Sequence, residues 1–303
     1  MSVAERVTVL PVRGPPRRPA HAALVSMRPR QWTKNLLVFA GIVFAAKLGD
    51  PGRWADAATA FIAFCAASSA AYLVNDVRDA EHDRLHPTKN ARPVARGELA
   101  PRAALVLAGG LALAAVVLSA ALGLSALLYL GAFLALQAAY TLVLKEVVLV
   151  DVMAIGALFV VRAAAGADAV RVPISPWLLL CTALLALFLG LAKRRGELVL
   201  VGADATPGRP VLAGYSLELV DQLVSVVAAS TVIAYALYTF SARDSKAMMV
   251  TIPFVLFGVF RYLLLIHRHD LGEEPENVLL SDRPILLCVA GWAVCAAAIL
   301  LLT

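Results

Sequence analysis

Three carboxylates and an amide lie at the end of one apolar segment, in the stretch NDVRDAEHD. In a helix these four residues fall within an arc of about 100°, because successive residues turn by about 100°, while Glu81 falls on the opposite side. Oxygen-only ligands suit magnesium, which usually contacts one or two carboxylates together with substrate phosphates. A solvated helix end is the simpler alternative. The spacing favours a magnesium-diphosphate site whose ligands are Asn75 and the catalytic residues Asp76, Asp79 and Asp83.

Bases follow the acids directly along the chain. Lys89 and Arg92 are expected to bind phosphate, Lys as a mobile point charge and Arg through bidentate hydrogen bonds. For each base taken alone, membrane topology and anionic lipid are equally good explanations.

A second charged stretch, LAKRRGEL, lies at the end of a later apolar segment. Lys193 and Glu197 are four residues apart and so share one face of a helix, with Arg194 beside them. The cluster is largely cationic, which favours an extra anion over a second metal ion. We therefore expect these three residues to bind substrate, with Lys193 and Arg194 contacting a phosphate.

The composition indicates a membrane protein that crosses the bilayer several times. Of 303 residues, 61% are hydrophobic and 16% are charged, against about 25% charged in an ordinary globular domain. The bases that give the net charge of +6 lie between apolar segments, which argues against nucleic acid as a partner. The cysteines lie inside apolar segments without metal-ligand spacing, so neither a disulfide framework nor a zinc site is expected.

Apolar runs that can cross a bilayer need about 20 residues, and their number predicts an all-α protein with nine transmembrane helices around a cavity that faces the cytoplasm. Residues 1–27, rich in Arg and Pro, are expected to form a disordered basic cytoplasmic tail, and residues 28–303 a single catalytic domain. The expected helices are 31–48, 54–76, 102–121, 124–144, 147–166, 175–193, 218–240, 247–267 and 284–303.

The distribution of bases predicts the orientation, because Lys and Arg are retained on the cytoplasmic side. With the N-terminus inside, most loop bases are cytoplasmic, and the long breaks 77–101, 194–217 and 268–283 fall on the same side. We therefore expect a multi-pass protein of the plasma membrane, with its N-terminus and active site in the cytoplasm and its C-terminus outside.

Further polar side chains approach the expected cytoplasmic mouth or lie within the bundle. Lys34, Tyr140 and Lys145 are expected to bind phosphate there, although anchoring at the membrane interface explains them almost equally well. Arg162 shares the azimuth of Asp151 on its helix but lies about 16 Å from it along the axis. The two cannot pair directly, so Arg162 needs another partner, in a structural or a substrate-lining role.

The motifs NDVRDAEHD and NARPVARGEL resemble the first acidic motif and the RPxxxG element of the UbiA-type intramembrane prenyltransferase superfamily. The resemblance implies nine transmembrane helices around a cavity that opens sideways to lipid, with Mg²⁺ as cofactor. Within the superfamily, the segments between Met27 and Pro284 are similar to the decaprenyl-phosphate phosphoribosyltransferase branch. These segments include MRPRQWTKNLLVFA, AYTLVLK, VVRAAAGA, LAKRRGEL and GEEPENVLLSDRP.

That branch implies transfer of 5-phosphoribose from phosphoribosyl diphosphate to a polyprenyl phosphate such as decaprenyl phosphate, on the way to arabinose donors for cell-wall arabinan. Aromatic prenyltransferases of the superfamily carry a second Asp-rich motif, commonly DxxxD, where this chain has LAKRRGELVLVGAD. Prenyl and phosphoribosyl donors both release diphosphate, so the acidic motif does not name the donor. The cationic second cluster favours ribose phosphate, because that donor carries a further phosphate.

Two other functions stay open at this point. One is an aromatic-acceptor prenyltransferase of quinone or haem biosynthesis, which uses the same first motif. The other is an ion-coupled transporter, because intramembrane carboxylates and Arg162 also suit a substrate pathway. The lipid bilayer is an expected partner in every case, and a homo-oligomer is an open possibility.

Overall fold

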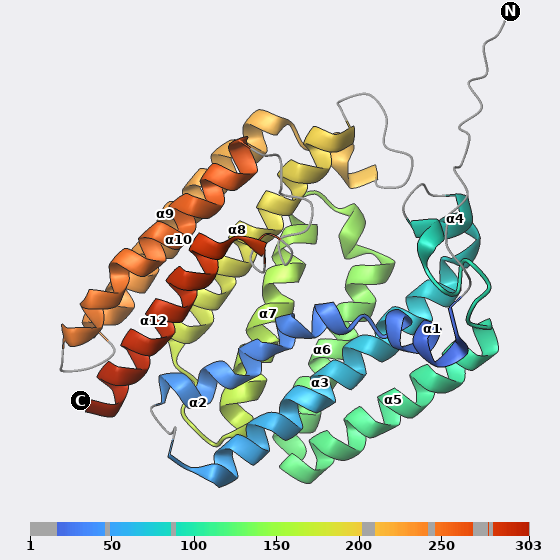
Figure 1. The fold of residues 1–303 in the computed structure, drawn as a ribbon, viewed down its shortest axis with the longest axis horizontal. Coiled ribbons are helices and arrows are strands. Elements are labelled where there is room, and N and C mark those ends of the chain that lie inside the picture. Colours follow the sequence, from blue (N-terminus) through green and yellow to red (C-terminus); the bar gives the residue numbers. More distant parts are fainter. Residues whose placement is uncertain are drawn as a thin grey trace, which may run out of the picture.

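The structure, a computed structural model, describes residues 17–45, 49–85, 89–201, 210–241, 246–268, 278 and 281–302. Helices account for the regular structure of these residues, which confirms the all-α prediction (Figure 1). Eight of the described helices are long and apolar enough to cross a membrane. The long α-helices are α3 Pro51–Arg78, α5 Pro101–Leu122, α6 Leu124–Leu142, α7 Val150–Ala169, α8 Pro176–Val201, α9 Leu217–Ser241, α10 Ile252–Arg268 and α12 Arg283–Leu302.

Of the nine predicted helices, the first, 31–48, is the one that is not among these eight spans. Its residues form the 3₁₀ helix η1, Pro29–Phe39, followed by the short α2, Ala40–Phe44. A tighter 3₁₀ segment rises further per residue than an α-helix and is uncommon at this length. The described residues therefore confirm eight spans of the nine, and the N-terminal segment enters the bundle in a different conformation.

The N-terminal tail also departs from the expectation within its described part. Residues Pro19–Ser26 form the helix α1, in which Ala22 and Ser26 are buried. Ala22 belongs to a cluster of apolar side chains with Leu73 of α3 and Ala104 of α5. The apolar contact explains why this part of the tail is ordered; residues 1–16 lie outside the described residues.

The bundle has two halves that meet at α7 and α8 (Figure 1). On one side α3 packs against α5 and α6, with Phe64 and Phe133 in its core. On the other side α8 packs against α9, and α10 against α12, around Phe188 and Tyr262. The ends of α3 and α8 and the short helix α4, Ala80–Leu85, lie at the same end of the molecule, so the fold brings the two charged stretches to one face.

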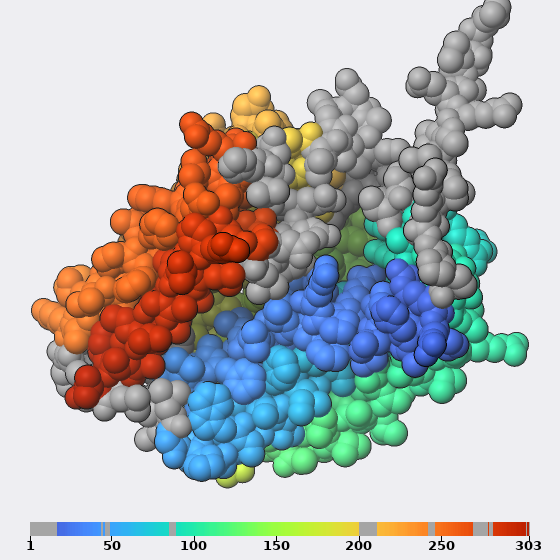
Figure 2. Space-filling view, in the orientation of Figure 1, coloured from blue at the N-terminus to red at the C-terminus, as the bar shows by residue number. Residues whose placement is uncertain are grey.

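Segment η1 is wedged between α3 and α7, and Figure 2 shows it in blue lying over α3. The approach to α7 is possible because residue 166 is glycine: a Cβ there would lie 2.0 Å from the carbonyl oxygen of Val38. Small residues commonly let helix backbones approach closely in membrane bundles. The glycine thus fixes the depth at which η1, and the residues just before it, sit against the bundle.

Candidate active site

Asp76 and Asp83 are the buried acids of the site, and two arginines hold them. Arg28 donates from Nη2 to Asp76 Oδ1 at 2.5 Å. Arg92 lies between the two acids, with Nη1 2.6 Å from Asp83 Oδ2 and 3.3 Å from Asp76 Oδ1. The acid side chains are 2% and 5% exposed, whereas those of Arg28 and Arg92 are 27% and 25% exposed. The acids therefore lie beneath the bases that pair with them.

The local fold places these acids because α3 ends just after the first of them. Asp79 terminates α3 with a non-helical backbone, at φ −92° and ψ 3°, and α4 begins at the next residue. Asn75 donates from Nδ2 to Asp79 Oδ2 at 3.0 Å. Backbone hydrogen bonds of 2.9 Å from Asp79 to Asn75 and from Asp83 to Asp79 keep the helical spacing across this turn. The four residues form two pairs, Asp76 with Asp83 around Arg92, and Asn75 with Asp79, and Glu81 is exposed.

The donor set can be tested against Mg²⁺. Within the described residues no three side chains from His, Cys, Asp and Glu lie close enough together to enclose a metal ion. Mg²⁺ does not need such a cage, because it keeps several waters and binds through one or two carboxylates plus substrate phosphates. Asp76 and Asp83, both within reach of the single Nη1 atom of Arg92, supply that number of carboxylates. The residues fit the ion.

The bases beyond the acids divide into those bound within the following loop and those close to the acids. Arg84 donates to the carbonyl of Ala95 at 3.1 Å, and Arg96 pairs with Glu98 at 3.1 Å. Lys89 is half-buried in the 3₁₀ helix η2, Lys89–Ala91, which packs against α4. Of the two bases expected to bind phosphate, Arg92 thus contacts the acids directly, and Lys89 lies close to them in the chain and the fold.

The second cluster differs from its prediction. Arg194 is completely buried and donates from Nε to Asp151 Oδ2 at 2.8 Å and from Nη1 to Glu197 Oε2. Tyr215 donates to the other oxygen of Asp151 at 2.7 Å and accepts the backbone N–H of Leu149 at 2.7 Å. We expected Arg194 to meet a phosphate, but this arginine is occupied by two carboxylates inside the protein. The correction follows from Asp151, a distant residue in sequence that the local charge pattern did not include.

The next base of this cluster is also matched by an acid. Arg195 pairs with Asp221 of α9 at 2.7 Å and donates to the carbonyl of Ile266 at 2.7 Å. The half-buried Lys193 is the third base, and it too has a polar or electrostatic partner. Arg194 and Arg195 thus contact three acids, Asp151, Glu197 and Asp221, and Lys193 adds a third base. The cluster is therefore close to neutral, which removes the argument that its positive charge selects a phosphoribosyl donor.

Arg162 has the separate partner that its distance from Asp151 required. It donates from Nε to Asn35 Oδ1 at 2.8 Å and from Nη1 to the carbonyl of Leu158 at 3.2 Å. Its guanidinium lies 4.5 Å from the ring centre of Phe133. Asn35 in turn donates to Cys65 at 3.2 Å. These contacts join η1, α3 and α7, so Arg162 holds these elements together. Asp151 pairs with Arg194 instead.

The other three expected phosphate ligands are half-buried. Lys34 lies in η1, Tyr140 near the end of α6, and Lys145 in the 3₁₀ helix η3, Leu144–Glu146. Tyr140 is close enough to Arg194 to interact with it electrostatically. The structure therefore brings Tyr140 to the second cluster.

Sequence reasoning missed Arg28, Asp151 and Tyr215. Arg28 stands in the segment MRPRQWTKN, which carries the family resemblance, but its left-handed backbone (φ 55°) and its contact with Asp76 depend on the fold. Asp151 was considered only in relation to Arg162, with which it cannot pair. No local pattern around Tyr215 indicates its hydrogen bond with Asp151.

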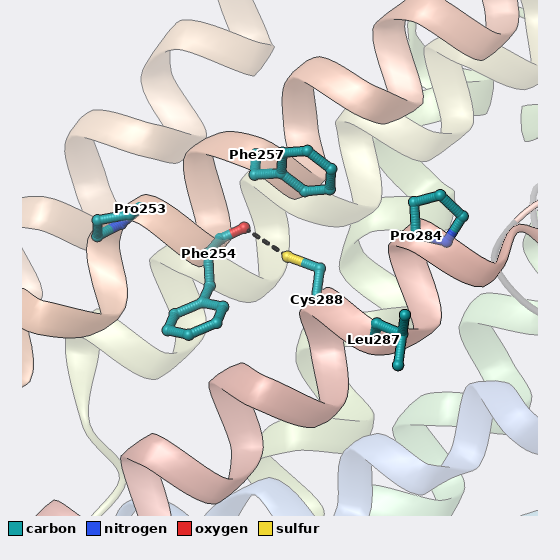
Figure 3. A pocket seen from close by; sticks show the side chains of 6 residues that line it. All are labelled: Pro253, Phe254, Phe257, Pro284, Leu287 and Cys288. Atoms are coloured by element: carbon teal, nitrogen blue, oxygen red, sulfur yellow. Dashed lines mark hydrogen bonds between the residues drawn. The ribbon is translucent and has the colours of Figure 1, made fainter.

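A groove of about 550 Å³ lies between α10 and α12 and does not belong to this site (Figure 3). Its lining is apolar apart from Cys288, whose thiol donates to the carbonyl of Phe254 at 2.9 Å. Among the described residues no acid or base lines it. The chemistry of the molecule is therefore assigned to the charged face.

The comparisons with known proteins agree with this assignment. Residues 36–281 match the UbiA prenyltransferase family. The chain belongs to that family. A curated relative from Mycolicibacterium smegmatis, named decaprenyl-phosphate phosphoribosyltransferase, is 36% identical over 298 residues, covering 93% of each chain. A relative of the same name from Corynebacterium glutamicum is 32% identical over 93% of this chain and 88% of that one. The resemblance recognised in the motifs is confirmed.

Solved structures support the fold. A UbiA homologue from Archaeoglobus fulgidus, bound to DMAPP and Mg²⁺, is similar with a TM-score of 0.70 and 19% identity, covering 93% of this chain and all of the other. A homologue from Aeropyrum pernix gives a TM-score of 0.60 at 16% identity. At these identities the likeness concerns the fold alone. Together with the apolar helices, it makes this chain an integral membrane protein of UbiA architecture.

Proposed function

We propose that the protein transfers 5-phosphoribose from phosphoribosyl diphosphate to a polyprenyl phosphate, decaprenyl phosphate in the first instance, and releases diphosphate. The observation that carries the proposal is the near-full-length similarity to relatives named for that reaction. The charged face supports it, because it offers two buried carboxylates and two arginines to a diphosphate group. The place of the product in arabinan assembly belongs to the same proposal.

Asp76 and Asp83 would hold Mg²⁺, with Asn75 and Asp79 on the adjoining turn. When bound, the ion neutralises charge that develops on the departing diphosphate. Arg28, Lys89 and Arg92 bind the phosphate oxygens and orient the group for departure, and guanidinium groups suit that task because they bind phosphate through two parallel hydrogen bonds. The polyprenyl phosphate is already anionic, so attack on the sugar requires no strong general base.

The donor's further phosphate and the acceptor phosphate need other ligands. The candidates are four half-buried polar groups, Lys193, Tyr140, Lys34 and Lys145. Arg194 and Glu197 act differently, since each is bound to the other inside the bundle. They position the end of α8, and with it Lys193, without contacting substrate. Arg162 acts likewise, by joining η1 to α7.

For orientation, we propose a cytoplasmic N-terminus and active site and an external C-terminus, in the plasma membrane. The charged ends of α3 and α8 lie at one end of the bundle, and α12 ends at the other (Figure 1). Clusters of bases are retained in the cytoplasm. Phosphoribosyl diphosphate is a polar cytoplasmic metabolite, so this orientation also gives the donor access.

Purified protein in detergent should convert labelled phosphoribosyl diphosphate and polyprenyl phosphate into lipid-linked ribose phosphate, with Mg²⁺ required. A prenyl diphosphate with an aromatic acceptor is the control for the related prenyl transfer. Product with the prenyl donor and none with the ribose donor would overturn the proposal. Release of diphosphate in detergent, where no ion gradient exists, would also exclude coupled transport as the primary activity.

A further inference from the structure

The two buried acids and the two arginines balance each other in charge. Arg28 and Arg92 both contact the same oxygen of Asp76, Oδ1, at 2.5 Å and 3.3 Å. Arg92 continues to Asp83 Oδ2 at 2.6 Å. Each carboxylate is therefore matched by a guanidinium, and the position between the acids is taken by Arg92 Nη1.

The backbone at Arg28 is fixed while its side chain is not enclosed. Ser69 donates to the carbonyl of Met27 at 2.9 Å and accepts from Trp32 Nε1 at 3.0 Å, which ties the segment on both sides of Arg28 to α3. The left-handed backbone, φ 55°, costs a non-glycine residue about 1 kcal/mol or more. The guanidinium lies over the ring of Tyr72, 4.6 Å from its centre, and the side chain is 27% exposed. The fold thus aims Arg28 at Asp76 and leaves its outer edge accessible.

A divalent cation at Asp76 Oδ1 would compete with the two guanidinium groups that contact this oxygen. Like charges at that separation repel each other, and the oxygen has few lone pairs. An ion bound at this oxygen would therefore weaken the contacts of Arg28 and Arg92 with Asp76. Their best new acceptors are phosphate oxygens, which arginine binds in the same bidentate geometry as a carboxylate.

We propose that Arg28 and Arg92 are exchangeable counter-ions: they neutralise Asp76 and Asp83 in the ligand-free site, and move to the donor's diphosphate when Mg²⁺ takes the acids. This rests on the proposed function only in that the donor carries a diphosphate. Metal and diphosphate then favour each other through the exchange as well as through direct contact. The exchange also assigns Arg28 as a diphosphate-binding residue.

The exchange has a quantitative signature. Without metal, diphosphate must compete with the acids for the arginines, so its apparent affinity is reduced by the fraction of arginine already held. Without diphosphate, metal must compete with the arginines for the acids. By linkage, the two ligands must raise each other's affinity by the same factor.

The first test uses inorganic diphosphate as the probe, measured by calorimetry on full-length protein in detergent without divalent metal. Asp76→Asn removes the charge that holds both arginines, so this variant should bind metal-free diphosphate about tenfold more tightly than the wild type, as expected for loss of a charged hydrogen bond. Asp83→Asn, which frees only Arg92, should give a smaller gain in the same direction. Unchanged or weaker binding in both folded variants would overturn the exchange, and if Asp76→Asn does not fold, Asp83→Asn decides alone.

The second test uses Arg28→Gln, with Arg30→Gln as the matched control, because Arg30 is an exposed arginine of the same segment. Arg28→Gln should bind Mg²⁺ alone several-fold more tightly and bind diphosphate in saturating Mg²⁺ about tenfold more weakly. Arg30→Gln should change neither. A loss of both affinities, or a gain of metal affinity with unchanged diphosphate binding, would overturn the proposal. Prenyl donors carry the same diphosphate. If the proposed donor is wrong, the ribose-transfer assay fails, but these binding tests keep their expected results.

Discussion

The acidic face and the Asp151 cluster contain the same kinds of groups in opposite arrangements. On the acidic face the acids are buried and the arginines are about a quarter exposed. In the other cluster Arg194 is 1% exposed and Asp151 fully buried, with Tyr215 completing the acid's hydrogen bonds. A charge pair that water and ligands cannot reach is costly to break, whereas an accessible pair can exchange partners. The first arrangement is therefore suited to binding, and the second to holding helices in place.

The largest expected effect comes from breaking the closed cluster. Asp151→Ala leaves the Arg194 charge with only Glu197 as its acidic partner and removes the acceptor of Tyr215, so we expect a loss of about 3–5 kcal/mol in the free energy of unfolding. Thermal or denaturant unfolding in detergent measures this loss. Glu146→Ala is the matched control, because this acid is exposed just before α7, and should change stability by less than about 0.5 kcal/mol. Equal stability of the two variants would refute the structural role of Asp151.

The accessible pair should show the reverse pattern. Asp83→Asn removes a carboxylate proposed for Mg²⁺, and kcat should fall by about 10²- to 10³-fold, the size of effect seen when one electrostatic stabiliser is removed. Its loss of stability should be smaller than that of Asp151→Ala, because the amide keeps its shape and a hydrogen-bond acceptor for Arg92. Glu81→Gln, on the exposed side of α4, is the control and should keep near wild-type turnover. Full activity of Asp83→Asn would remove the proposed metal site.

The packing of η1 against α7, which positions Arg28 of the acidic face, can be tested at Gly166. An added Cβ would lie 2.0 Å from the Val38 carbonyl, so Gly166→Ala forces η1 away from α7 at a cost of about 1–3 kcal/mol. The shift should also displace Arg28, which precedes η1, and lower the affinity for diphosphate. Gly109→Ala in α5 is the matched control, because nothing lies within 4 Å of its added Cβ. Should both variants unfold at the same temperature, the close approach of η1 would not limit stability.

The sequence predicted the elements better than the contacts between them. Hydrophobic runs located the eight described spans because each needs a fixed length of apolar residues, a property of local sequence. The 3₁₀ conformation of η1 was not predicted, since it depends on packing against α7 at Gly166. The shared helical face of the acids around Asp76 follows from their spacing, but their contacts with Arg28 and Arg92 depend on the fold. The pairing of Arg194 with Asp151 was not predicted, because the two residues lie 43 positions apart in the chain.

The smallest expected effect lies at the edge of the acidic face, in an ion pair that links the N-terminal segment to the loop after α4. Glu98 accepts hydrogen bonds from Arg17 at 2.7 Å and pairs with Arg96 at 3.1 Å. Burial raises the pKa of Glu98, but the hydrogen bonds and charge of Arg17 and Arg96 outweigh it, so the pKa lies below the usual 4.5. A lowered carboxyl pKa stabilises the fold at pH above 4.5 and loses that contribution as the pH falls through the folded-state value.

Glu98→Gln should therefore unfold at a slightly lower temperature than the wild type at neutral pH. The loss in the free energy of unfolding should be less than about 1 kcal/mol, since partly exposed pairs are weak. The difference should shrink as the pH is lowered through 4.5 and beyond, because the wild type then loses the charge that the variant never had. Unfolding scans of both proteins across this range measure the effect. A difference that stayed constant with pH would mean that Glu98 acts through packing and neutral hydrogen bonds, and that accessible ion pairs here contribute no charge-dependent stability.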